Sequence, residues 1–147
     1  MPNDVFNTGD DFDPVRLVRR CYDAWDEKDV DAIMACCAAD AVYHVHVPSD
    51  VLRFAGRHEG HAAIRACLEA ILAEYDFLAF AVDWISGTGA TVRARVLYYY
   101  RHPVTGDQFD AGFRQVWRVS EGRVAQVDEY HDVARLKAFL DMTRGGG

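Results

Sequence analysis

The chain has 147 residues, half of them hydrophobic and 12% aromatic, which predicts one domain with a buried core and argues against disorder. The net charge of -7, with Lys and Arg scattered along the chain, argues against nucleic acid or an anionic membrane as a partner. The acidic start MPNDVFNTGDDFD is unlike a signal peptide, and no apolar run approaches the ~20 residues of a membrane span. Four cysteines without disulfide or zinc spacing indicate a reduced, cytoplasmic protein.

The first half of the chain predicts three helices and one clear strand. Asp13 followed by Pro14 is a typical helix start, because an N-capping side chain precedes a proline at the first helical position. Apolar residues recur at helical spacing after it, whereas AVYHVHVP alternates as a strand does. The expected elements are a flexible tail over 1–12, helices over 14–28, 30–40 and 61–75, a strand over 41–48 and a short strand at 53–55.

The second half predicts an antiparallel meander and a short final helix. Four segments rich in β-branched and aromatic residues are separated by SGTGA, PVTGD and SEG, which are typical of glycine-bearing turns. Helices followed by strands give an α+β fold, with a strongly curved antiparallel sheet packed on three N-terminal helices around an internal pocket. The expected strands are 77–85, 91–102, 108–119 and 123–133, within a single domain over 13–142 that leaves 143–147 as a frayed end.

Three segments resemble the NTF2-like superfamily, in its SnoaL-like and ketosteroid-isomerase-like branch. They are YDAWDEKDVDAIMACCAADAVYH, FAGRHEGHAAIRACL and FRQVWRVSEGRVAQVDEYHDVARL, and the resemblance extends from residue 14 to about 140. It implies a cone-shaped fold with an internal pocket, and a homodimer formed through the outer face of the sheet. This fold hosts isomerases, cyclases, dehydratases, epoxide hydrolases and non-catalytic binders, so the resemblance does not specify a reaction.

The catalytic sets of that superfamily fit the sequence unevenly. The tyrosine and aspartate of the steroid isomerases fall on Cys21 and Val45, which suit that chemistry poorly. The Arg-x-Asp pair of the limonene-epoxide-hydrolase-like branch falls on Val96 and Tyr98, and its last aspartate falls on Glu129. The late aspartate and histidine of the SnoaL-like cyclases have a chemically similar counterpart in the EYHD segment that begins at Glu129.

Glu129 and His131 are the predicted catalytic pair. They are two residues apart on the last strand, on the same face as Val127 and roughly 7 Å apart, and that face is expected to point inward. A buried carboxylate beside an imidazole can take up and release a proton near neutral pH. In the alternative interpretation Glu129 only braces the sheet, through a backbone group or an arginine such as Arg114 or Arg118.

Strand parity and helical spacing predict the other residues of the pocket. Tyr98 is expected to donate a hydrogen bond to the oxyanion that develops on a carbonyl substrate. In the alternative interpretation, each aromatic residue is part of the hydrophobic core and does not contact a ligand. The predicted substrate-binding residues are Tyr22, Trp25, Val45, Tyr100, Phe113, Gln115 and Val127.

The two histidines of AVYHVHVP are expected on the outer face of the sheet. Tyr43 and Val45 share the face that suits the helix-covered side, which leaves His44 and His46 on the other, unless a one-residue slip reverses the register. A metal set of both histidines with Glu129 and His131 would need both strands to face the same way, so neither a metal nor a cofactor is predicted.

The predicted function is cofactor-independent acid/base chemistry on a small hydrophobic carbonyl compound, by isomerisation, cyclisation or dehydration. Glu129 would be the base or proton shuttle, and His131 its partner. The alternative is a non-catalytic module that binds a small hydrophobic ligand or a protein partner. The sequence leaves open whether the protein is an enzyme.

Overall fold

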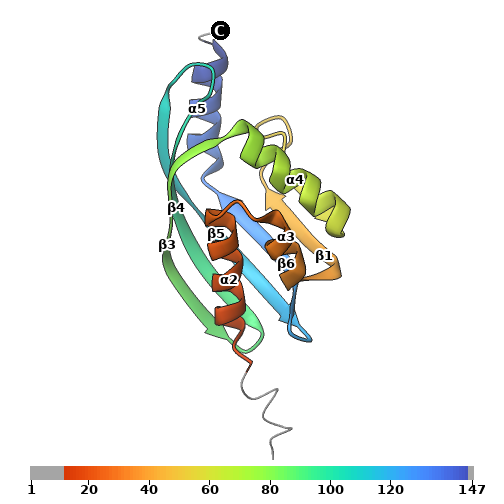
Figure 1. Cartoon of the computed structure of the whole chain (residues 1–147). Helices are drawn as coiled ribbons and strands as arrows, with labels where there is room; N and C mark the ends of the chain where they lie inside the picture. Colours follow the sequence, from red (N-terminus) through yellow and green to blue (C-terminus); the bar gives the residue numbers. More distant parts are fainter. Residues whose placement is uncertain (1–11, 146–147) are drawn as a thin grey trace, which may run out of the picture.

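The computed structural model describes residues 12–145, which form four helices and six strands (Figure 1). The predicted tail therefore lies outside the described residues, except for Phe12. In chain order the elements are α2 (Pro14–Asp26), α3 (Val30–Cys36), β1 (Cys37–His46), β2 (Gly56–Glu59), α4 (His61–Glu74), β3 (Asp76–Thr88), β4 (Thr91–Arg101), β5 (Gln108–Ser120), β6 (Arg123–His131) and α5 (Val133–Gly145).

The six strands form one curved sheet in the order β2-β1-β6-β5-β4-β3. The hairpin-linked strands β3 to β6 pair antiparallel, as predicted, and so do β1 and β2. The sheet is nevertheless mixed, because β1 and β6, which are far apart in the sequence, pair in parallel. Helix α2 packs against β3, β4 and β6, whereas α4 packs against β1 and β2. Helices α2, α3 and α4 thus cover one face of the sheet (Figure 1), and the predicted α+β fold is confirmed.

Local signals set the ends of the first two helices. The Asp13 carboxylate accepts a hydrogen bond from the backbone N–H of Val15 at 3.0 Å, as its place before a proline predicts. Asp29 caps α3 in the same way, but that helix ends at Cys36 and not at residue 40. The change from helix to strand at this point keeps Cys36 and its neighbour Cys37 both buried. All four cysteines are free and buried, as expected.

Among the other boundaries that differ from the sequence-based prediction are those of the short strand and of the last helix. The short strand that follows AVYHVHVP lies at Gly56–Glu59 and not at 53–55, and it pairs with β1. The last helix continues to Gly145, beyond the expected end at 142, because Thr143 is buried and its hydroxyl donates to the carbonyl of Leu140 at 2.8 Å. No helix within residues 12–145 has the length and apolar character needed to cross a membrane.

Candidate functional site

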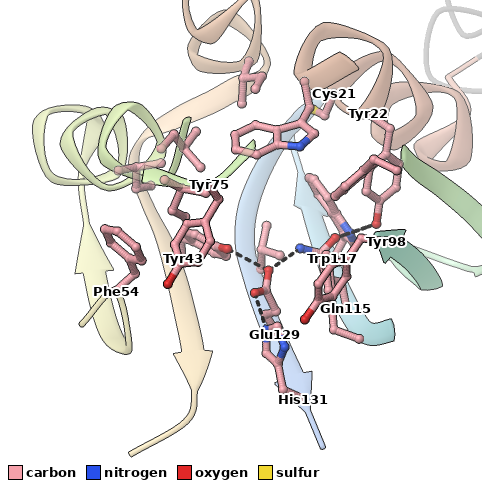
Figure 2. Close-up of a pocket in the computed structure, with 18 of the residues that line it drawn as sticks. Cys21, Tyr22, Tyr43, Phe54, Tyr75, Tyr98, Gln115, Trp117, Glu129 and His131 are labelled. Carbon is pink, nitrogen blue, oxygen red and sulfur yellow. Dashed lines mark hydrogen bonds and ion pairs between the residues drawn. The ribbon is translucent and has the colours of Figure 1, made fainter. Parts of the chain in front are cut away.

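A pocket of about 160 Å³ lies between the helices and the covered face of the sheet. Its wall is mostly apolar and rich in aromatic residues, with a small polar region contributed by β1, β5 and β6 (Figure 2). Nine of the ten predicted site residues line it, and their roles stay predictions: Glu129, His131, Tyr98, Tyr22, Trp25, Tyr100, Phe113, Gln115 and Val127.

Val45 is the predicted site residue that does not line the pocket. Its parity is as expected, since it is 1% exposed and is paired with Glu129 across the β1–β6 register. The pocket wall on β1 is instead made by Cys37, Ala41, Val42 and Tyr43. The longer side chain of Tyr43, two residues earlier on the same face, reaches the polar groups, whereas the short Val45 side chain ends in the core.

Glu129 is the centre of the polar region. Its Oε1 accepts hydrogen bonds from the Tyr43 hydroxyl and from the Gln115 amide, each at 2.7 Å, and its Oε2 lies 2.7 Å from Nε2 of His131 (Figure 2). These partners come from β1, β5 and β6, which are neighbours in the sheet. The alternative of an arginine brace is wrong, because Arg118 lies 3.5 Å from Asp128 on the opposite face.

A second chain of hydrogen bonds holds Gln115 in place. The Tyr22 hydroxyl donates to Oε1 of Gln115 at 2.5 Å, and the indole N–H of Trp117 lies 3.1 Å from the Tyr22 hydroxyl and 3.2 Å from the same Gln115 oxygen. With its carbonyl oxygen occupied, Gln115 directs its NH₂ group toward Glu129. Residues of helix α2 and strand β5 therefore fix the orientation of the Gln115 amide that donates to the Glu129 carboxylate.

Hydrogen bonding keeps Glu129 ionised in spite of its burial. Burial alone would raise the pKa of this carboxyl, but the hydrogen bond and charge of His131, and the hydrogen bonds of Tyr43 and Gln115, hold the pKa below its ordinary value. Burial and the Glu129 charge both raise the pKa of Tyr98, as they raise that of Tyr43. The site therefore contains one carboxylate among phenols that remain protonated.

Aromatic rings in contact with one another form part of the apolar pocket wall. Trp25 from α2 packs against Phe80 of β3 with ring centroids 6.1 Å apart, and Phe80 packs against Phe113 of β5 at 6.1 Å. Phe113 lies 5.0 Å from the His131 ring, so the aromatic wall reaches the polar region. Such a pocket suits a hydrophobic ring compound with few polar groups.

His44 and His46 lie outside the pocket, on the outer face of the sheet, as strand parity predicts. Nε2 of His46 lies 2.9 Å from Oδ1 of Asp128, and the ring of His46 stacks between those of His44 and Tyr130. The pKa of Asp128 is below its ordinary value: burial acts to raise it, but hydrogen bonds from His46 and Gln126 outweigh that effect.

The possible metal ligands on this face do not fit a metal ion. Ligand atoms of His44, His46 and Asp128 lie within 4.8 Å of one another. The two imidazoles are stacked, however, with centroids 3.9 Å apart and planes 15° from parallel. An imidazole binds a metal in the plane of its ring, and two nearly parallel planes share no such position. The set that would include Glu129 and His131 is divided between the two faces of the sheet.

Sequence reasoning missed several residues of the pocket. Tyr43 was placed on the inward face but not assigned to the site, although it donates to Glu129. Trp117 also lines the pocket, and its contact with Tyr22 joins residues 95 apart in the sequence. Phe77 and Phe80 of β3 both line the pocket because the register shifts between Phe77 and Ala79. A strand with strict alternation would place one of those two rings outward.

The chain belongs to the SnoaL-like domain family, whose profile matches residues 18–127. A comparison with curated proteins finds no match. Among solved structures, an NTF2-like protein from Burkholderia thailandensis E264 is similar at 23% identity, with a TM-score of 0.76 over 86% of this chain and 96% of that chain.

Two other similar structures have descriptions that name a small molecule or a reaction. TerC, co-crystallised with polyporic acid, is 16% identical, with a TM-score of 0.70 over 89% of this chain and 98% of its own. A Mycobacterium tuberculosis epoxide hydrolase of the limonene-epoxide-hydrolase-like type is 20% identical, with a TM-score of 0.68 over 90% of each chain. At these identities the similarity shows the fold alone.

Proposed function

We propose that this protein is a cofactor-independent enzyme that moves a proton on a small hydrophobic carbonyl compound, in an isomerisation, cyclisation or dehydration. The observation that supports this most directly is the Glu129 carboxylate, which is buried in an aromatic pocket and lies 2.7 Å from the imidazole of His131. A carboxylate and an imidazole in contact give a proton two adjacent positions, as a proton shuttle requires.

The roles follow from hydrogen-bonding capacity. A carboxylate has about four acceptor positions, and three donors occupy Glu129, which leaves one for a proton taken from the carbon next to a carbonyl. The C–H electron pair then forms a C=C bond with the carbonyl carbon, while the π pair of the C=O bond moves onto the oxygen, which gives an enolate. Tyr98 lines the same pocket, and its raised pKa keeps it protonated, so its hydroxyl is the proposed donor to that oxygen. Return of the proton to another atom completes an isomerisation.

The second candidate is a binding module without catalysis, and one observation favours it. The same three donors that stabilise the Glu129 carboxylate also hold its pKa low, which makes it a weak base. A bound ligand that displaced Tyr43 or Gln115 would remove part of this effect. The TerC structure, which contains polyporic acid, supports binding of an aromatic or oxygen-bearing ligand equally under either candidate.

Exchange of α-protons with solvent separates the two candidates. Cyclic and aryl ketones incubated with the protein in D₂O should lose their α-proton NMR signals, and Glu129→Gln should slow this at least ~100-fold, the lower end of what one general base contributes. Glu69→Gln, on the exposed side of α4, is the matched control and should exchange like the parent protein. Ketone binding without exchange by the parent protein would establish the binding module instead, and unchanged exchange by Glu129→Gln would remove Glu129 as the base.

A further inference from the structure

Tyr100 carries the one buried side-chain polar atom within the described residues that has no hydrogen-bond partner. The residue is 2% exposed, and its side chain lines the same pocket as Glu129. Buried hydroxyl groups in proteins nearly always have a partner, because a buried donor left without one loses its hydrogen bonds to water without replacement. This hydroxyl therefore requires an explanation.

Two tyrosines of the polar region, Tyr22 and Tyr43, show the usual pattern. The Tyr22 hydroxyl bonds to Gln115 and accepts from Trp117, and the Tyr43 hydroxyl donates to Glu129. Tyr100 is instead enclosed by aromatic rings, whose centroids lie 5.1 to 6.2 Å from its own: Tyr75, Phe77, Tyr98, Phe109 and Phe139. Ring faces and edges are weak acceptors compared with an oxygen atom.

The position of Tyr100 separates it from the polar region at Glu129. Glu129 is opposite Gln115 in the sheet, whereas Tyr100 is opposite Phe109, nearer the start of β5 and beside α5. Between them the pocket wall consists of rings such as Phe113. The pocket thus has Glu129 toward one end and Tyr100 toward the other, with Tyr98 and Phe113 at register positions between them.

We infer that the natural ligand is a ring compound with two oxygen substituents, one that accepts a hydrogen bond from Tyr98 beside Glu129 and the other hydrogen-bonded to the Tyr100 hydroxyl. The identity of the first oxygen as a carbonyl rests on the proposed function, whereas the second rests on Tyr100 alone. The cavity of about 160 Å³ is close to the ~150 Å³ that accommodates benzene in an engineered cavity, which favours a compact ring system. Burial raises the pKa of Tyr100, so its hydroxyl stays a donor.

The first experiment uses the ligand-free protein. Tyr100→Phe removes a hydroxyl without a partner, so its Tm should equal or exceed that of the parent protein. Tyr22→Phe is the matched control, since it removes a hydroxyl with two partners and should lower the Tm. A Tm for Tyr100→Phe that falls as far as that of Tyr22→Phe would show that the Tyr100 hydroxyl already has a partner, and would overturn the inference.

The second experiment measures Kd values for two pairs of ketones of different length. The pairs are acetophenone with 4'-hydroxyacetophenone, and 2-acetonaphthone with 6-hydroxy-2-acetonaphthone. In at least one pair the added hydroxyl should tighten binding to the parent protein about fivefold to tenfold, as one hydrogen bond allows, and Tyr100→Phe should abolish that gain. If no hydroxylated ketone binds, or if the gain persists in Tyr100→Phe, the inference is wrong.

These outcomes are distinct from those that test the proposed function. Ketones that exchange α-protons and depend on Glu129, but gain nothing from the second oxygen, would leave the proposed function intact and overturn the role of Tyr100. A Tyr100-dependent gain in affinity without any proton exchange would support the role of Tyr100 and overturn the proposed catalysis. The protein would then be a ligand-binding module.

Discussion

Glu129 places a negative charge beneath three helices, and its neighbours account for the stability of that charge. Removing a carboxylate from water is costly, and it is tolerated only where donors replace the lost hydration. Tyr43, Gln115 and His131 provide those donors from three strands of the sheet. The contacts that keep Glu129 ionised therefore also join β1, β5 and β6. Glu129 thus contributes to the stability of the fold as well as to the proposed chemistry.

The contribution of Glu129 to stability should depend on pH in a defined direction. Its pKa in the folded protein is below the ordinary value of 4.5, so the ionised form stabilises the fold above that pH, and this stabilisation is lost as the pH falls through the folded-state pKa. Glu129→Gln keeps the shape but not the charge, and should cost about 1–3 kcal/mol at pH 7. Urea denaturation of both proteins between pH 7 and pH 3 should show the difference shrinking below about pH 4.5.

Glu69→Gln is the control for that measurement, because Glu69 is exposed and lies 3.6 Å from Arg65 in a surface ion pair. Its unfolding free energy should stay close to that of the parent protein at every pH. A difference for Glu129→Gln that is independent of pH would mean that the folded-state pKa is not depressed.

Among the strands, β4, β5 and β6 could be predicted from the sequence together with the faces of their side chains. Alternation placed Tyr98, Gln115 and Glu129 inward, and the structure has them on one pocket wall. The parallel pairing of β1 with β6 has no local signal, because the partners are about 85 residues apart and no hairpin sets their register. Tyr43 could therefore not be matched to Glu129 in advance, although its inward face was predicted.

Strand β5 approaches β4 closely at Gly112, which gives a prediction at the level of the sheet. A Cβ atom at this position would lie 2.9 Å from the backbone oxygen of Val96 and 3.0 Å from a methyl carbon of Leu97. The Leu97 side chain can move, but the backbone of β4 cannot shift without disturbing its pairing. Gly112→Ala should therefore destabilise the protein by about 1–3 kcal/mol, as overpacking does.

Chemical denaturation measures this effect, with Ser120→Ala as the control. Ser120 is exposed at the end of the same strand, so its replacement should change the unfolding free energy by less than about 0.5 kcal/mol. Equal stability of Gly112→Ala and the parent protein would show that the two strands separate easily at this point, and that the close approach does not constrain the sheet.

At the scale of the whole molecule, the outer face of the sheet carries large apolar side chains that the fold leaves uncovered. Trp84 is 53% exposed, Leu97 42%, Tyr99 37% and Tyr130 45%, and they come from β3, β4 and β6. Helices α2, α3 and α4 do not cover this face, because they lie on the other one (Figure 1). Clustered apolar groups on a protein surface are typical of an interaction site, so a homodimer through this face stays our proposal for the assembly.

A charge in the centre of that face should separate the two copies. Leu97→Glu should weaken self-association at least tenfold, because burying a leucine contributes about 2 kcal/mol and a buried carboxylate without a partner is costly. In a two-fold interface each substitution occurs twice, which doubles the effect. Sedimentation equilibrium of the parent protein should give the mass of a dimer, and that of Leu97→Glu the mass of a monomer with an unchanged circular dichroism spectrum. Val104→Glu is the matched control, because Val104 is 85% exposed in the loop between β4 and β5 and away from the proposed interface. A parent protein that sediments as a monomer would contradict the proposed assembly, as would a Leu97→Glu variant that remains a dimer.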